Sequence, residues 1–236
     1  MSGQLFEMTQ SAGSRRRERL FEMLAFLSLI VPSMCLSFLM VRQVSLGFVV
    51  TAVATISRDL GLATLIAFFL WRNAETKDRI GLHLHGGLKN VILGAALFVV
   101  VLLASLYLEQ WLHAAGFSTR SAPTPAFLTA RGSAEFVLAI LLVGVVALTE
   151  EIIFRGYLIL RLKTVTGSSV LAVALSSVIF CLGHGYEGTA GVVTVGFTGL
   201  AYALVYVWTE SLTAPIVMHF LQDIVGIVVL PILRHK

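Results

Sequence analysis

The sequence predicts an all-α polytopic membrane protein with about seven transmembrane helices. Hydrophobic residues make up 57% of the 236 residues, and the mean hydropathy is +0.90. Charged residues make up 13%, about half the ~25% that is usual for soluble domains. A soluble fold of this length could not bury so much apolar surface, so we expect the bilayer to be the solvent.

The first 19 residues are polar, end in a basic stretch, and are expected to form a cytoplasmic N-terminal tail. The apolar run 20–41 is longer than a signal-peptide core and lacks a cleavage pattern, so it predicts a retained first span. The second span, 48–71, contains Arg58 and Asp59. Charges are costly in lipid, so these two should face other helices or water. Two short half-spans broken at these charges are an alternative.

A polar and basic segment, 72–89, leads to a third span at 90–108 and a longer loop at 109–133. The fourth apolar run begins at 134, and its helical pattern continues to Lys163. The remaining spans are predicted at 168–183, 191–208 and 214–233. Alternation from a cytoplasmic N-terminus places 72–89 and the basic residues 155–163 inside, in agreement with the positive-inside rule. Six or eight spans are alternatives.

The net charge of +4 comes mainly from basic residues in short loops between apolar runs. Such charges set membrane topology, so no nucleic-acid partner is expected. We divide the chain into the tail 1–19, N-terminal membrane helices and loops at 20–133, and a C-terminal core at 134–236.

Glu150, Glu151 and Arg155 interrupt the fourth apolar run. Glu151 and Arg155 are four residues apart on a helix and can pair. Glu150 points roughly 100° away from Glu151 and is free to enter a cavity, where a carboxylate shielded from bulk water could serve as a general base. A helix end with solvated charges is the alternative.

Two further pairs place polar groups in apolar spans. Phe180 and His184 share a helical face at the end of the fifth span, and His219 and Asp223 share a face in the seventh. Histidine transfers protons near neutral pH. The alternatives are a helix-terminal histidine and a structural hydrogen bond between helices. The helix from Glu150 to the turn near Lys163 is roughly 20 Å long, and the return from that turn to His184 is roughly 24 Å long. Glu150 and His184 can therefore meet at one level of the membrane.

Three strings on separate spans, in order, carry a resemblance to a known family. Residues 150–155 (EEIIFR) look like the EExxxR motif of the CPBP family of CAAX proteases and bacteriocin-processing enzymes, also called the Abi family. Residues 180–184 (FCLGH) and 219–223 (HFLQD) resemble its FxxxH and HxxxN/D motifs. The resemblance covers about the C-terminal 40% of the chain and implies that 134–236 is a CPBP-like catalytic core.

The resemblance implies an intramembrane endopeptidase. Glu150 would activate water with the help of His184, while His219 and Asp223 would stabilise the oxyanion or orient the base. Glu151, Arg155 and Phe180 would be supporting residues.

One position departs from the prenyl-protein-cleaving members, which have Asn where this chain has Asp223. An ionised Asp cannot donate a hydrogen bond, so Asp223 should be protonated, orient His219 or bind a metal. The cofactor is open: a zinc site could use Glu150, His184, His219 and Asp223, although a mechanism without metal is slightly favoured because there is no HExxH motif.

The expected partners are membrane lipid and a peptide or protein substrate, which could be lipid-modified. The expected location is the plasma membrane of a bacterium or archaeon. Two other function classes fit the same helices. One is a non-catalytic membrane scaffold or immunity-type protein; the other is a proton-coupled transporter, because carboxylates and histidines also form proton relays.

Overall fold

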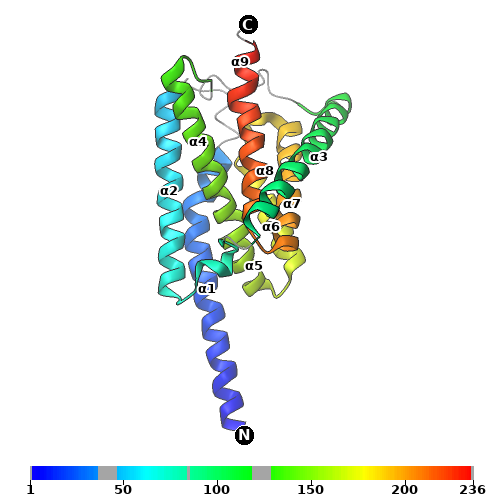
Figure 1. The fold of residues 1–236 in the computed structure, drawn as a ribbon. Coiled ribbons are helices and arrows are strands. Elements are labelled where there is room, and N and C mark those ends of the chain that lie inside the picture. The colour runs from blue at the N-terminus through cyan, green and yellow to red at the C-terminus, as the bar shows by residue number, and fades with distance from the viewer. Residues whose placement is uncertain (1, 37–46, 84–85, 119–128, 235–236) are drawn as a thin grey trace.

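A computed structural model describes residues 2–36, 47–83, 86–118 and 129–234, and every regular element in these ranges is helical. The result confirms the predicted all-α class. Figure 1 shows the elements in order: α1 (Ser2–Leu36), α2 (Phe48–Arg72), η2 (Lys77–Ile80), α3 (Gly87–Ala114), α4 (Ser133–Glu151), η4 (Ile152–Leu158), α5 (Ile159–Thr166), α6 (Ser169–Leu182), η5 (Gly185–Glu187), α7 (Gly188–Thr209), α8 (Thr213–Asp223), η6 (Ile224–Val229) and α9 (Leu230–Arg234).

Six helical segments are long and apolar enough to cross a membrane, and the 14-residue α6 is a shorter apolar helix. The prediction of about seven membrane helices is therefore confirmed. Helix α2 is continuous from Phe48 to Arg72, which excludes the alternative of two half-spans. Helix α1 includes most of the predicted tail, and α3 extends to Ala114, into the predicted loop 109–133. Residues 119–128 of that loop lie outside the described part.

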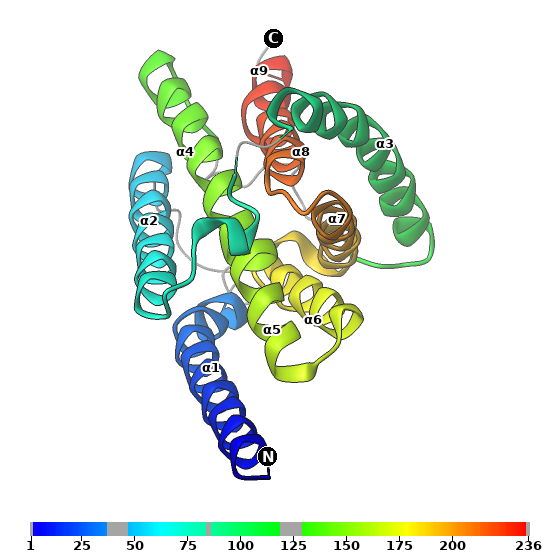
Figure 2. The ribbon, with the colours of Figure 1, turned by 60° about the horizontal axis from the view of Figure 1, so that its bottom comes forward.

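The continuous helix formed by α4, η4 and α5 is the centre of the bundle. Figure 2 shows it running between α2 and α1 on one side and α6 and α7 on the other. It packs against α2, α8, α6 and α1. In its most apolar window 44% of residues are buried inside the protein, against 17–39% in the other five spans. Its central position brings Glu150, Glu151 and Arg155 into contact with the helices around it.

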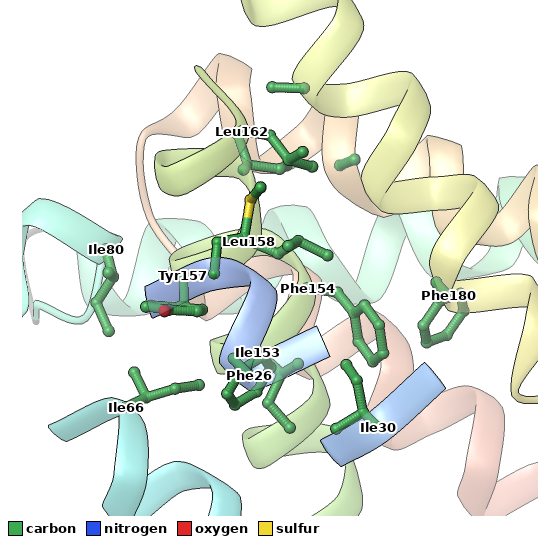
Figure 3. Packing of buried hydrophobic residues seen from close by; sticks show 14 of the residues in the cluster. Phe26, Ile30, Ile66, Ile80, Ile153, Phe154, Tyr157, Leu158, Leu162 and Phe180 are labelled. Carbon is green, nitrogen blue, oxygen red and sulfur yellow. The ribbon is translucent and has the colours of Figure 1, made fainter. Parts of the chain in front are cut away.

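An aromatic and aliphatic core packs around η4 (Figure 3). The ring centroid of Tyr157 lies 5.1 Å from that of Phe26 on α1 and 6.1 Å from that of Phe69 on α2. Phe154 meets Phe180 of α6 edge to face at 5.1 Å. Aromatic pairs at these distances add stability beyond the area they bury, so η4 is held against three helices.

A buried ionic network joins α1, the end of α2 and α5. Arg161 donates from Nε to Glu22 Oε1 at 2.7 Å and from Nη2 to Glu75 Oε2 at 2.7 Å. The second carboxylate oxygen of Glu22 accepts from Asn73 Nδ2 at 2.7 Å, and Tyr157 Oη donates to Glu22 Oε1 at 3.0 Å. The charges in this network are all paired, as buried charges require.

We expect Arg161→Met to lower the free energy of unfolding by up to about 3 kcal/mol, because it removes the closer cation of Glu22 and leaves Glu22 with Arg19, whose Nη1 donates to Glu22 Oε2 at 3.3 Å. The matched control is Lys163→Met, an exposed position on the same helix. Thermal unfolding of the purified proteins in detergent would measure the difference. Equal unfolding temperatures for the two variants would contradict the structural role of this network.

Candidate active site

Two π-helical segments begin directly after the acidic residues of the site. Helix α4 ends at Glu151 and continues as the π-helix η4, and α8 ends at Asp223 and continues as the π-helix η6. Such wide turns are rare in proteins as a whole, and those that occur often lie at functional sites. Within η4 the carbonyl oxygen of Phe154 accepts a hydrogen bond from Ser176 Oγ of α6 at 2.6 Å. A side chain of a neighbouring helix thus supports the altered backbone.

Glu151 is the most enclosed carboxylate of the site, with a side chain that is 0% exposed. Its Oε1 accepts from Arg155 Nη1 at 2.7 Å, which confirms the predicted pairing of these two residues. The same oxygen lies 2.7 Å from His219 Nδ1 of α8. Since a carboxylate accepts, Nδ1 carries the hydrogen in this bond. Arg155 Nη2 also donates to the carbonyl oxygen of Gly199 at 3.1 Å, so α4, α7 and α8 are joined through these groups.

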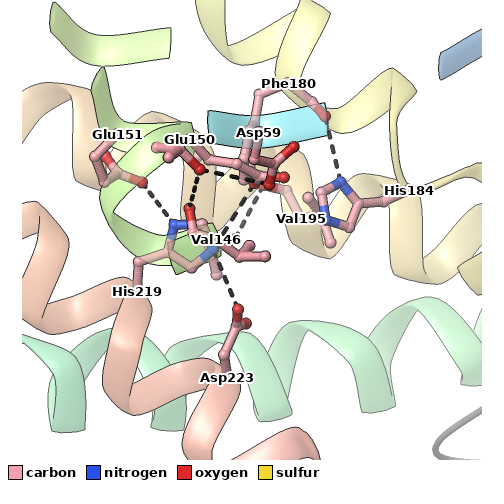
Figure 4. A network of polar contacts seen from close by, with 12 residues as sticks. Asp59, Val146, Glu150, Glu151, Phe180, His184, Val195, His219 and Asp223 are labelled. Carbon is pink, nitrogen blue, oxygen red and sulfur yellow. Dashed lines mark hydrogen bonds and ion pairs between the residues drawn. The ribbon is translucent and has the colours of Figure 1, made fainter. Parts of the chain in front are cut away.

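Glu150 projects differently from its neighbour, as its place on the helix predicts, and its side chain is 17% exposed. Its Oε2 lies 3.9 Å from His219 Nε2, and Oδ2 of Asp223 lies 3.6 Å from the same nitrogen. These separations are ion-pair distances that are too long for a direct hydrogen bond. Figure 4 shows His219 surrounded by Glu150, Glu151 and Asp223.

His184 follows α6 and joins the cluster through Phe180. Its Nδ1 lies 3.3 Å from the carbonyl oxygen of Phe180 (Figure 4). The ring of Phe180 lies 5.1 Å from that of His184 and 6.0 Å from that of His219. The carboxylate of Asp223 is within electrostatic range of His219 and His184, which attract it, and of Glu150, which repels it. The structure therefore brings the four predicted catalytic residues together, although within the described part His184 makes no hydrogen bond to Glu150.

The charged pair of α2 belongs to the same region. Asp59 is buried, and its Oδ1 accepts from Arg58 Nε at 2.8 Å, while Thr149 Oγ1 of α4 donates to its Oδ2 at 3.4 Å. The charge of Glu150 interacts with both residues. The prediction that Asp59 faces another helix is confirmed. The sequence indicated that Arg58 and Asp59 were unusual in an apolar span, but it did not indicate that they lie near Glu150.

Two residues of α7, Tyr202 and Gly199, pack against the site. The ring of Tyr202 lies 5.8 Å from that of His219, and the guanidinium carbon of Arg155 lies 5.4 Å from the centre of the Tyr202 ring. A Cβ atom at Gly199 would lie 2.8 Å from Phe180 Cδ1 and 3.4 Å from Arg155 Nη2. Glycine at this position therefore lets Phe180 and Arg155 approach the backbone of α7.

The sequence left open a zinc site at Glu150, His184, His219 and Asp223. Among the described residues, no three His, Cys, Asp or Glu side chains are arranged to hold a metal ion.

The fold and the site define a polytopic membrane protein with a buried cluster of carboxylates and histidines. Residues 132–225 match the family model described as type II CAAX prenyl endopeptidase Rce1-like. The match confirms the resemblance to the CPBP family, and it includes every predicted site residue from Glu150 to Asp223. No curated protein and no solved structure matches the chain. At the level of the family, the match supports an intramembrane endopeptidase of the CAAX-protease type.

We expect Gly199→Ala to lower the free energy of unfolding by about 1–3 kcal/mol, the usual cost of overpacking. The control is Gly144→Ala in α4, where a Cβ atom would meet nothing within 4 Å. Both changes gain the helix propensity of alanine, up to about 1 kcal/mol, so their difference isolates the clash. Thermal unfolding in detergent measures it, and a Gly199→Ala protein as stable as Gly144→Ala would show that α7 can move away without cost.

Proposed function

We propose that the protein is an intramembrane endopeptidase that hydrolyses a peptide bond in a membrane-associated or lipid-linked peptide. The observation that carries the proposal is the position of Glu150: a partly accessible carboxylate beside His219 and Asp223, inside a bundle of membrane helices. Hydrolysis within a membrane needs a base, an electrostatic partner and shielding from bulk solvent, and this arrangement offers all three.

In the proposed reaction Glu150 is the general base. It removes a proton from a water molecule as the water oxygen bonds to the carbonyl carbon of the scissile peptide. The carbonyl π electrons move to the oxygen, which becomes an oxyanion. When the intermediate collapses, the C–N bond breaks and Glu150 returns the proton to the leaving amine. His184, in the same electrostatic cluster, assists Glu150.

The difference between the two adjacent glutamates supports this assignment. Glu151 is fully enclosed, and its Oε1 is engaged by Arg155 and His219. It therefore holds the imidazole of His219 in place, with Nε2 facing Glu150 and Asp223. Asp223 orients His219 in this proposal, a role that suits an acid where the prenyl-protein-cleaving members have Asn.

The proposed substrate is a peptide or protein segment at the membrane, and a lipid-modified terminus fits the apolar surroundings. We propose a cytoplasmic N-terminus, which the basic loops favour under the positive-inside rule. We further propose the plasma membrane of a bacterium or archaeon as the location.

We expect Glu150→Gln to reduce cleavage by about 10²–10⁴-fold, the usual contribution of general acid–base catalysis. A quenched fluorescent peptide library, incubated with purified protein in detergent, would measure cleavage. Glu109→Gln, an exposed acidic position on α3, is the matched control and should cleave like the wild type.

Other outcomes would redirect the assignment. Equal cleavage by the wild type and Glu150→Gln would remove Glu150 as the base. Absence of cleavage by folded wild-type protein would favour the scaffold or immunity-type alternative, and pH-driven flux in proteoliposomes would favour the transporter. A zinc chelator added to the active protein, followed by zinc, would establish whether a metal takes part.

A further inference from the structure

The proposed reaction places negative charge on a carbonyl oxygen, and preorganised donors stabilise such charge. Most polar groups of the site are unsuited to this task. The terminal nitrogens of Arg155 already donate to Glu151 and to Gly199. The carboxylates of Glu150 and Asp223 only accept hydrogen bonds when they are ionised. A buried neutral donor whose hydrogen is not engaged would be free to meet such charge.

Tyr202 of α7 has such a hydrogen. Its side chain is almost fully enclosed, with 2% of the residue surface exposed. Its Oη is buried and has no hydrogen-bond partner among the described residues. The ring packs beside His219, and the hydroxyl is within electrostatic range of Glu151 and Asp223. These are the two acidic residues that lie against the opposite ring nitrogens of His219.

The hydroxyl of Tyr202 costs stability in the resting protein. A buried donor without a partner costs about 1–3 kcal/mol, and phenylalanine would fill the same space without that cost. Tyr157, the other large buried tyrosine near the centre of the bundle, donates its hydroxyl hydrogen to Glu22 at 3.0 Å. The contrast leaves the hydroxyl of Tyr202 available to a group that arrives during function.

We propose that Tyr202 is a catalytic residue whose hydroxyl donates a hydrogen bond to the carbonyl oxygen of the scissile peptide. This inference rests on the proposed function. The proton remains on Tyr202 throughout: the bond strengthens as the oxyanion forms and weakens when the carbonyl is restored. Glu150 alone moves the proton from water to the leaving amine. Tyr202 thus supplies the donor that the acid at position 223 cannot supply when it is ionised.

The test compares Tyr202→Phe with Tyr157→Phe, since each removes one buried phenolic oxygen and keeps the ring. We expect Tyr202→Phe to lower kcat about 10²–10³-fold, as loss of one oxyanion donor does, and to leave KM nearly unchanged. Its unfolding temperature should be equal to or above that of the wild type, because an unsatisfied group is lost. Tyr157→Phe should show the reverse, with a lower unfolding temperature and wild-type kcat.

A second measurement uses binding instead of turnover. A peptide phosphinate, which imitates the tetrahedral intermediate, should bind Tyr202→Phe about 10²-fold more weakly than it binds the wild type, whereas the product peptide should bind both equally. Wild-type kcat for Tyr202→Phe, or an unchanged phosphinate affinity, would overturn the inference. So would a lowered unfolding temperature accompanied by equal losses in product and phosphinate binding, because that result indicates a structural role.

The two proposals fail in different ways. A wild-type protein that needs Glu150 but not Tyr202 overturns only the role of the tyrosine. A wild-type protein that cleaves no peptide and binds no phosphinate overturns the proposed function, and the inference falls with it.

Discussion

The arrangement of this site depends on one carboxylate oxygen, Oε1 of Glu151. In a bilayer no bulk water can solvate a buried charge, so a carboxylate must find its partners within the protein. This oxygen has two, Arg155 on its own helix and His219 on α8. Arg155 in turn reaches the backbone of α7 at Gly199. The pairing thus fixes the positions of three helices and the orientation of the imidazole that faces Glu150.

The π-helix η4 connects this site to the rest of the fold. Within its seven residues, Arg155 serves the site, Phe154 packs on α6, and Tyr157 reaches Glu22 of α1. The ionic network around Arg161 follows on the next turn. Two polar networks and an aromatic core therefore share one short segment. A shift of η4 would disturb the site and the docking of α1 together, which makes the bundle and the site a single mechanical unit.

The sequence predicted those features that follow from local helix geometry. Glu151 and Arg155 pair at the expected four-residue spacing, and the two charges of α2 lie inside a continuous span. The π-helices had no signal, because their residues have ordinary helical composition. Arg161 and Glu22 are 139 positions apart, and one sequence does not reveal such a partnership. Tyr202 looks like an ordinary core residue of an apolar span, so only the structure places it beside His219.

Adjacent glutamates have different surroundings because successive residues on a helix point about 100° apart. Glu151 turns fully inward, and Glu150 keeps 17% of its side chain exposed. The two glutamates are chemically identical and differ in accessibility. The enclosed Glu151 positions His219, and the more accessible Glu150 is the one proposed to act on water. The surroundings are rich in carboxylates, and the cation Arg155 is already engaged. Charge that develops on a substrate is then best met by hydrogen bonds from neutral donors, which are stronger at low dielectric than in water.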